Sequence, residues 1–588
     1  MIDNLETQVS SDNNKAKRYI LACYKEAKEA RKDRENQWKE VYGEYSGNQP
    51  RWAQKAEWQT KLFIPRLSSM IKKTTAIMRQ ALIEADEFWT IGPPFPDTFS
   101  NNAMPQTQSQ DNLADDKKNF VRDAVNKVFD DNNFFKTFSI AAKYAMLTSL
   151  MIAKIYYKND WIAIEAIDPF DIYLDPSGKN RYVIHKTIQD YDAIKKSAVA
   201  GIYDLSEVEK LPLTYDSKDK REDAERRGVI PTNMHSRRQV TLLEFYGDII
   251  DDEGKKDTIY NQVATIANEN FLIKTPQPNP YYHNKPPFVI TAIDWDPKSI
   301  YHHSIYENQL SLIRTSSELM ESITDGAKIT AVPMAEIDID KVENADDILD
   351  TIEPGKLFKT HDGGNALTIK HFPAFAPEVM SLISAFNMEM QNTSGMTEFL
   401  QGQPTSKGRP TAREVLSKTN QGLSLFESYA RNIENDWITP IIEMVYQNLI
   451  MLVTQNKVKN IKPILAKYNY NTDAMTPVQR TLLVEGDYQF KTFGISMTVS
   501  NQDRLEKIIN FLKIIGNLPG IAQRLNADGI LSQIAKLLSI HQSQFVNPAP
   551  APQPMPVQPQ VPGAPIVPPV PAGPPANPVQ QNTQGVRK

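Results

Sequence analysis

The spacing of the apolar residues changes once near Met151, and this change constrains the fold more than any other feature of the sequence. Before it, apolar residues recur every three or four positions, which is typical of amphipathic helices. After it, 153–157 and 161–167 alternate apolar and polar residues, which is typical of half-buried strands. The helical spacing returns from His303 onward. The sequence therefore predicts an α+β protein, mostly helical, with a β-rich module between helical segments.

The predicted helices fall on both sides of the β-rich module. They span 13–45, 52–85 with a break at Pro65, 120–138, 140–152, 303–329, 379–393, 412–433, 437–455, 504–515 and 521–540. A short strand is predicted at 170–174. The strands 240–250, 258–267 and 270–274 are predicted to form a meander, 286–290 to close the β module, and 487–499 to contain a strand pair. The polar stretches 92–117 and 212–238 are predicted to be loops.

Composition narrows the class of protein. The net charge is −5, from 66 basic and 71 acidic residues, which excludes a protein whose whole surface binds nucleic acid through positive charge. The single cysteine, Cys23, excludes an internal disulfide framework and a cysteine zinc site. We expect no membrane-spanning helix, because the apolar stretch near 141–155 is interrupted by lysines. Residues 547–585 carry no charge and fourteen prolines, so we expect a disordered, proline-rich tail.

No arrangement of residues in the sequence indicates catalysis. The eight histidines form no H-E-x-x-H motif, and glycine-rich phosphate loops are absent. Asp338 and Asp340 could resemble a metal pair, but alternate acids in a strand are better explained as facing solvent together. The segment 15–39 holds nine basic and four acidic residues, a mixture that favours a solvated helix face over a nucleic-acid surface. We therefore expect no enzyme activity, no catalytic residue, no metal and no cofactor.

Several motifs in a fixed order resemble the portal proteins of tailed bacteriophages, especially those with short tails. The motifs are Ile167-Asp-Pro-Phe-Asp-Ile-Tyr-Leu-Asp-Pro176, Leu242-Leu-Glu-Phe-Tyr-Gly247, Pro286-Pro-Phe-Val289, Ser394-Gly-Met-Thr-Glu-Phe-Leu-Gln-Gly402 and Arg409-Pro-Thr-Ala-Arg-Glu-Val415. The resemblance covers about residues 15–540 and implies a ring, with twelve subunits expected, at one vertex of the capsid.

The resemblance also implies a division of the chain into portal domains. These are an N-terminal helical wing (1–150), a β-rich wing (151–300), a first stem helix (301–328), a small α/β clip (329–373), a second stem helix (374–393), a tunnel loop (394–412), long wing helices with a β segment (413–499), short crown helices (500–546) and the proline-rich tail (547–588). We expect no long C-terminal barrel, because only about 100 residues separate Trp437 from that tail.

The expected function is a conduit for packaging and ejecting viral DNA, with no membrane contact. The expected partners are further copies of this chain, double-stranded viral DNA, the major capsid protein, the large terminase and a tail adaptor. By this resemblance Lys407 and Arg409 in the tunnel loop contact DNA, Glu378 and Glu389 on the second stem helix line the channel, and the clip docks partners. The acidic residues expected on that clip surface are Asp338, Asp340, Asp346, Asp347 and Asp350.

Two other classes of protein stay open from the sequence. One is a different structural or adaptor protein of a virion, and the other is a DNA-processing enzyme. A portal is expected to assemble in the host cytoplasm and to function in the virion. A lumen through which DNA slides must not bind phosphates tightly, because each neutralised phosphate adds to the affinity. The acidic second stem helix fits this requirement.

Overall fold

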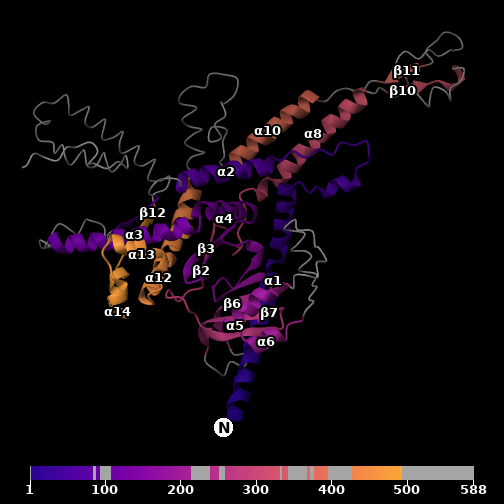
Figure 1. The fold of residues 1–588 in the computed structure, drawn as a ribbon. Helices are drawn as coiled ribbons and strands as arrows, with labels where there is room; N and C mark the ends of the chain where they lie inside the picture. Colours follow the sequence, from indigo (N-terminus) through magenta and orange to yellow (C-terminus); the bar gives the residue numbers. More distant parts are fainter. Residues whose placement is uncertain are drawn as a thin grey trace, which may run out of the picture. The chain divides into compact units, whose positions relative to one another are not determined.

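The computed structural model describes residues 2–83, 88–92, 108–212, 239–250, 258–331, 334–341, 367–370, 376–394 and 427–492. They contain helices and strands in separate modules, which confirms the expected α+β class (Figure 1). The predicted tunnel loop from 395 on, the crown 500–546 and the tail 547–588 lie outside the described residues, as does most of the predicted clip.

The N-terminal segments are helical as predicted, but several boundaries differ: the first helix begins at Ile2, 55–65 is not helical, and the helix expected over 140–152 ends at Thr148, before β2 (Leu150–Lys158). The elements are α1 (Ile2–Ser46), the short helix η1 (Pro50–Gln54), α2 (Arg66–Leu82), α3 (Gln108–Asp131) and α4 (Phe134–Thr148). The predicted loop 92–117 was wrong in its second half, because α3 already begins at Gln108. Asn133 lies in the left-handed region with a φ of 48° and caps α4, so α3 and α4 are two helices where a single one was expected over 120–138.

A five-stranded antiparallel sheet forms the larger β module. Its strands lie in chain order: β4 (Ile172–Leu174), β5 (Tyr182–Asp190), β6 (Gln239–Ile249), β7 (Ile259–Ala267) and β8 (Phe271–Pro278). The predicted meander β6–β7–β8 is therefore present. One face of the sheet packs against α1, and the other packs partly against α5 (Tyr191–Val199) and α6 (Leu205–Glu209). The sequence analysis did not predict β5, α5 or α6.

A second, three-stranded sheet has the order β3–β2–β9. It comprises β2 (Leu150–Lys158), β3 (Trp161–Ala166) and β9 (Phe288–Ala292). The segment 286–290, predicted to close the β module, lies in this sheet, because β9 pairs with β2 over five residues. A strand's own sequence indicates that it is a strand but not which neighbour it pairs with.

A buried ionic cluster joins the two sheets. Lys154 Nζ on β2 lies 2.5 Å from Glu244 Oε2 on β6, and His185 Nδ1 on β5 lies 3.3 Å from the same oxygen. Burial alone would raise the pKa of Glu244, but the charge of Lys154 and the hydrogen bond from His185 outweigh it and hold this pKa far below its usual value. The carboxylate is therefore charged and paired where the sheets meet.

The C-terminal part of the described chain is one interrupted helix followed by short elements. The helix runs from residue 427 through the π-helical turn η7 (Glu434–Ile438) into α12 (Thr439–Thr454), so the predicted break between 433 and 437 is a π-helical turn instead. After η8 (Lys459–Ile461) follow α13 (Lys462–Lys467), η9 (Thr472–Ala474) and α14 (Pro477–Val484). The span 427–454 is long and apolar enough to cross a membrane by length and composition only, and 67% of its most apolar 18 residues are buried inside the protein.

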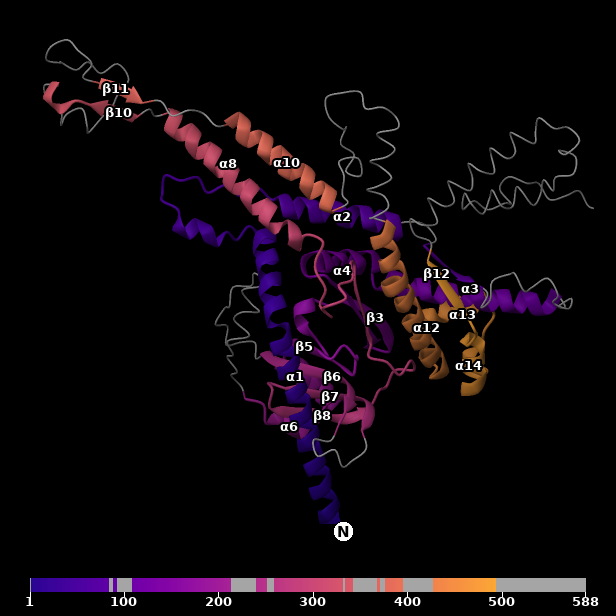
Figure 2. The ribbon, with the colours of Figure 1, turned by 180° about the vertical axis from the view of Figure 1, so that it is seen from behind.

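The last described strand pairs with a distant segment rather than with its own neighbour. β12 (Gln489–Thr492) pairs antiparallel with β1 (Trp89–Gly92), and Phe490 faces Ile91 in this register. The prediction of a local strand pair within 487–499 is therefore wrong for 489–492, which pair with β1 instead. In the largest apolar core, Trp437 is fully buried against Phe134 and Phe138. α12 lies beside β12 and α3 (Figure 2).

Candidate functional site: the two-helix hairpin and its base

Two helices far apart in the sequence run side by side as an antiparallel hairpin. α8 (Leu310–Ala331) follows the short helix η4 (Glu307–Gln309), and α10 (Ala376–Ser394) returns along it (Figure 1). The strands β10 (Met334–Ile337) and β11 (Leu367–Lys370) pair antiparallel at the far end, with η5 (Ile339–Lys341) after β10. These helices overlap the segments predicted to be stem helices, 301–328 and 374–393, although α8 begins only at Leu310 and ends at Ala331.

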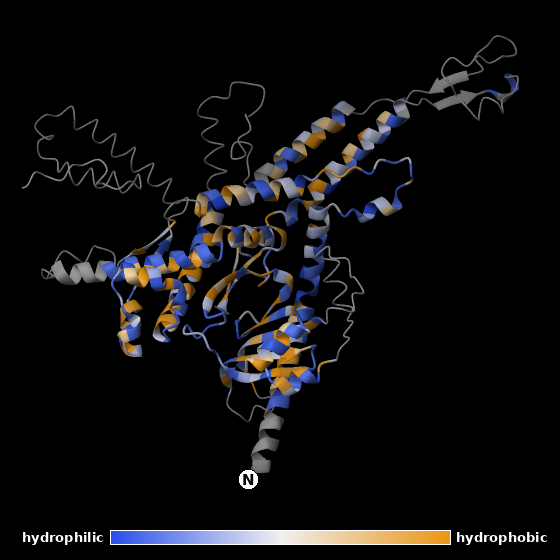
Figure 3. Cartoon of the chain, viewed as in Figure 1, coloured by the Kyte–Doolittle hydropathy of each residue, from blue (hydrophilic) through white to orange (hydrophobic). Residues whose placement is uncertain are grey.

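Three different faces are present on α10. Ile383 and Met390 are buried, and they lie seven residues apart on the side that packs on α8. A second face carries Glu378, Leu382 and Glu389 at helical spacing, all exposed. A third face carries Met380, Ser384 and Met388, and the two methionines are 48% and 65% exposed. Figure 3 shows hydrophobic and polar residues alternating along this helix. The hairpin therefore leaves apolar surface uncovered within this chain.

Glu321 on α8 holds a long excursion of the chain against the hairpin. We call this excursion, residues 47–65 between α1 and α2, the hook. The Glu321 carboxylate accepts hydrogen bonds from Trp52 Nε1 at 2.8 Å, Lys55 Nζ at 2.7 Å and the Leu62 backbone N–H at 3.0 Å. Its side chain is only 1% exposed. Burial would raise the pKa of Glu321, but these donors outweigh burial and hold the pKa below its usual value.

One turn further along α8, a second carboxylate holds the outer part of the hook. Asp325 Oδ1 accepts from the Thr60 backbone N–H at 2.7 Å and from the Thr60 hydroxyl at 2.6 Å. Lys328 Nζ donates to the Trp58 carbonyl at 3.0 Å. Charged and backbone hydrogen bonds of this kind have directional geometry, so the hook has a defined position on α8.

Arg66, the first residue of α2, connects both helices of the hairpin. Its Nη1 donates to Asn387 Oδ1 on α10 at 3.1 Å and to the Ser316 hydroxyl on α8. Burial lowers the pKa of this guanidinium, although arginine stays protonated in proteins. Ser316 and Asn387 therefore lie at the same level along the hairpin.

The base of the hairpin is an ionic joint between α1 and the chain that enters α8. Arg34 on α1 donates to both carboxylate oxygens of Glu307, at 2.8 and 2.9 Å, and its Nη1 lies 3.0 Å from His303 Nδ1. His303 Nε2 lies 3.2 Å from Asp296 Oδ2. Burial raises the pKa of Glu307, but Arg34 outweighs this effect and lowers it below its usual value. The bidentate pair fixes the direction in which the hairpin leaves the wing.

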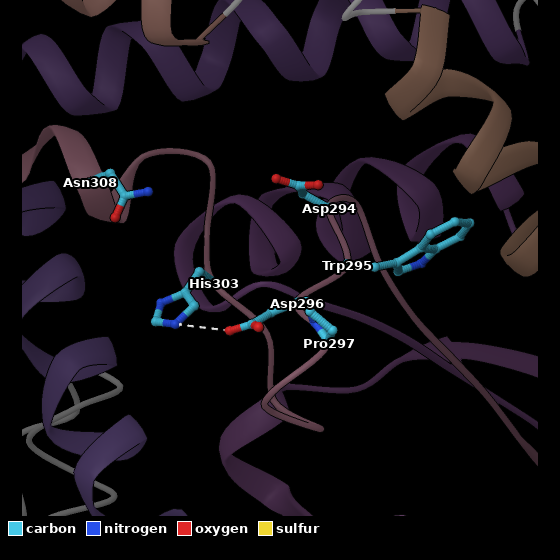
Figure 4. Close-up of a pocket in the computed structure, with 6 residues that line it drawn as sticks. All are labelled: Asp294, Trp295, Asp296, Pro297, His303 and Asn308. Carbon is cyan, nitrogen blue, oxygen red and sulfur yellow. Dashed lines mark ion pairs between the residues drawn. The ribbon is translucent and has the colours of Figure 1, made fainter.

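A shallow surface pocket of about 300 Å³ lies beside this joint (Figure 4). Its lining residues are Asp294, Trp295, Asp296, Pro297, His303 and Asn308. The adjacent histidines His302 and His303 have different partners: His302 Nδ1 accepts from the Asp296 backbone N–H at 2.9 Å, whereas His303 contacts carboxylates. Among the residues that the structure describes, no group of three His, Cys, Asp or Glu side chains is placed to hold a metal ion.

The first motif of the portal resemblance has a structural role that the sequence did not indicate. The buried Arg31 of α1 donates to the carbonyls of Ile172 at 2.6 Å, Phe170 at 3.0 Å and Pro169 at 3.2 Å. Its guanidinium carbon lies 3.9 Å from the ring centroid of Tyr173. The turn Asp168-Pro-Phe-Asp171 therefore accepts hydrogen bonds from α1 and connects this helix to the larger sheet.

Only some of the predicted site residues lie in the described part of the chain. Glu378 and Glu389 share the exposed acidic face of α10, and Asp338 pairs with Lys341 at 2.6 Å while Asp340 is exposed. The hydrogen bond from Lys341 holds the pKa of Asp338 below its usual value. The remaining five predicted residues lie outside the described residues: Asp346, Asp347, Asp350, Lys407 and Arg409.

The hook contacts were missed by sequence reasoning. One feature points to them: Glu321 is an acidic residue on the same helix face as Ser317, which lies four residues earlier and is buried. An acid on a buried face requires partners, and the only sequence indication of them is a tryptophan and two bases at positions 51–55. Sequence spacing alone could not connect segments that are about 270 residues apart.

Comparison with known protein families gives one match, which covers residues 104–463 and is described as Phage SU10 portal protein. No curated protein matches the chain. The match spans more than half of the 588 residues and includes the β-rich module and the complete hairpin. The chain therefore belongs to the Phage SU10 portal protein family, the portal proteins of short-tailed phages, which are structural components of the virion at the capsid vertex.

Proposed function

We propose that twelve copies of this chain form a ring through which double-stranded viral DNA is packaged into the capsid and later ejected. The proposal rests on the family match and on one observation, which is the exposed apolar surface of the hairpin. On α10, Met380, Leu382 and Met388 are 48%, 44% and 65% exposed. Exposed apolar residues grouped on one helix favour contact with another protein surface. In a closed ring, each hairpin has a neighbour on both sides.

The second stem helix supplies the proposed channel lining. Glu378 and Glu389 are both exposed, and α10 contains no basic residue. A lumen lined by carboxylates repels the phosphate backbone and limits tight binding of DNA. The tunnel loop 394–412 then supplies the few positive contacts, Lys407 and Arg409. Replacing both with glutamate should leave the ring intact and reduce DNA packaging or retention in particles.

The clip is the proposed docking surface for the large terminase during packaging and for the tail adaptor afterwards, while the wing contacts the major capsid protein. From Glu336 to Asp362 the sequence contains nine acids and three lysines, a charge that favours basic partners. The proposed docking residues are Asp338, Asp340, Asp346, Asp347 and Asp350. Charge reversal of Asp346 and Asp347 should weaken binding of the terminase or of the adaptor at low salt, and unchanged binding would contradict this role.

Microscopy of the purified protein tests the ring. Twelve subunits of 66.6 kDa give a particle of about 0.8 MDa with an axial hole. Mass photometry at micromolar concentration should detect this particle, which we expect to assemble in the host cytoplasm. A chain that stays monomeric across salt and pH would contradict the proposal. Removing residues 547–588 should leave assembly unchanged, because that segment has no apolar periodicity.

A further inference from the structure

Trp58 is 57% exposed although the backbone on both sides of it is held in place. The hook is fixed on α8 through Glu321, Asp325 and Lys328, and it would need none of these contacts to serve as a simple connection between α1 and α2. Burying a carboxylate as completely as Glu321 is costly unless it is well paired. A fixed segment that presents a large aromatic side chain to solvent has the properties of an interaction anchor, since tryptophan is enriched among the residues that dominate binding energy.

The same chain offers a complementary surface on the other flank of the hairpin. Met380 and Met388 form the exposed apolar face of α10. Thioether and indole groups attract each other, with sulfur about 5 Å from the ring. The charges are also compatible. Arg51 and Lys55 pair with Glu318 and Glu321 within the chain, which leaves Lys61 as an exposed base of the hook, whereas α10 contains two acids and no base.

Both surfaces lie at the same level along the hairpin. Arg66 joins Ser316 on α8 to Asn387 on α10. Because the helices are antiparallel, nine residues beyond Ser316 on α8 correspond to nine residues before Asn387 on α10. Those positions are Asp325, which binds the hook at Thr60, and Glu378, two residues from Met380.

Within one chain the hook is held on α8, through Glu321, Asp325 and Lys328. The hook and α10 both contact α8, and both views of the ribbon show α8 running between them (Figures 1 and 2). Two different patches on opposite flanks of one hairpin make a heterologous contact, which is the kind that closes a ring when repeated around an axis.

We propose that the hook of each subunit docks on α10 of the neighbouring copy. Trp58 is then seated against Met380, on the helix face of α10 that continues toward Met388. This inference rests on the proposed ring and adds to it a specific contact: the hook carries an anchor from the wing of one subunit to the stem of the next. The stem of each subunit is then completed by its neighbour.

Site-directed cross-linking tests the contact. In a Cys23→Ala background, Trp58→Cys and Met380→Cys variants are prepared separately, mixed before assembly and treated with a short bismaleimide. The proposal predicts a covalent dimer of the two variants, and it predicts a ladder of covalent oligomers when one chain carries both cysteines. The matched control pairs Met380→Cys with Trp295→Cys, an equally exposed tryptophan at 56%, and should give no ladder.

The outcomes separate this inference from the proposed function. If rings form but the Trp58–Met380 cross-link does not, the docking contact is overturned and the proposed ring is not affected. Cross-linking inside a single chain also overturns it, because it would place the hook on its own α10. A parent chain that never forms rings overturns both proposals.

A second measurement keeps the test independent of cysteine chemistry. Trp58→Ala should raise the protein concentration needed for half-maximal ring assembly by about tenfold or more, as expected for a hot-spot residue, and Trp58→Phe should retain most of the assembly. The thermal midpoint of the unassembled chain should not change, because the indole is mostly exposed. Equal assembly of the Ala variant and the parent would overturn the proposal.

Discussion

The wing and the hairpin of this protein are stabilised by different kinds of contact. In the wing, Trp437, Phe138 and Phe245 are fully buried within apolar clusters. In the hairpin, α8 is held by the buried carboxylate Glu321, while α10 leaves Met388 exposed. Apolar burial is non-directional and scales with area, whereas ionic hydrogen bonds fix geometry and contribute less net stability. The segments predicted to form the wing are therefore stabilised mainly by their apolar core, whereas the hairpin is held in position by ionic contacts and keeps apolar side chains exposed.

The largest expected effect comes from breaking the apolar core of the wing. Trp437→Ala removes an indole whose ring centroid lies 5.8 Å from that of Phe134, and this should lower the free energy of unfolding by about 4 kcal/mol. Urea denaturation followed by circular dichroism measures the loss. Trp295→Ala, at a surface tryptophan, should change this free energy by about 0.5 kcal/mol or less. Similar losses in both variants would show that the wing does not depend on its apolar core.

A somewhat smaller effect is expected at the ionic cluster between the sheets. Lys154→Met leaves Glu244 buried without its main partner and should lower the free energy of unfolding by about 3 kcal/mol. Adding Glu244→Leu removes the unpaired charge and should restore most of the loss. If the double variant is less stable than the single one, the cluster contributes more than mutual charge compensation.

The same carboxylate predicts a pH dependence of wing stability. The pKa of Glu244 is lower in the folded protein than the usual value of about 4.3 for glutamate. Its contribution to stability is therefore complete above that value and is lost as the pH falls toward the folded pKa. Thermal midpoints measured from pH 7 to pH 3 should fall in acid, and they should fall less steeply in the Lys154→Met/Glu244→Leu variant.

A local effect is expected in the hairpin. Glu321→Gln removes the charged carboxylate that accepts from Lys55 and Trp52. The free energy that holds the hook on α8 should therefore fall by about 1–3 kcal/mol, while the wing keeps its stability. Limited proteolysis should cut 47–65 faster in this variant than in Glu318→Gln, because Glu318 pairs with Arg51 of the hook through a side chain that is 55% exposed and therefore screened by solvent. Unchanged cleavage would contradict the role of Glu321 as the anchor.

The smallest effect is expected in the clip. Asp338→Asn breaks an ion pair with Lys341 in which both side chains are largely exposed, at 42% and 52%. Exposed pairs of this kind are screened by solvent and salt and contribute little. The thermal midpoint should not change measurably in 0.15 M salt. A clear drop would show that the clip, like the wing, depends on the contacts within one chain.

The family and the main elements could be predicted from local patterns. Helical spacing predicted α1, α8 and α10, because the residues that face a neighbour repeat every three or four positions whatever that neighbour is. Alternation predicted β6, β7 and β8 for the same kind of reason, and short turns between consecutive strands favour a meander. The order of the motifs carried the portal resemblance, which the family match over 104–463 confirms.

The tertiary structure alone decided which distant segments meet. β9 pairs with β2 instead of with the meander, and β1 pairs with β12 about 400 residues away. Glu321 accepts a hydrogen bond from a segment about 260 residues earlier in the chain. Periodicity shows that a residue is buried but not what buries it, because partners are selected by the packing of the whole chain. The sequence by itself therefore determined the family of this protein and most of its long helices and meander strands, and three-dimensional packing decided the sheet order, the joint at Arg34 and the position of the hook.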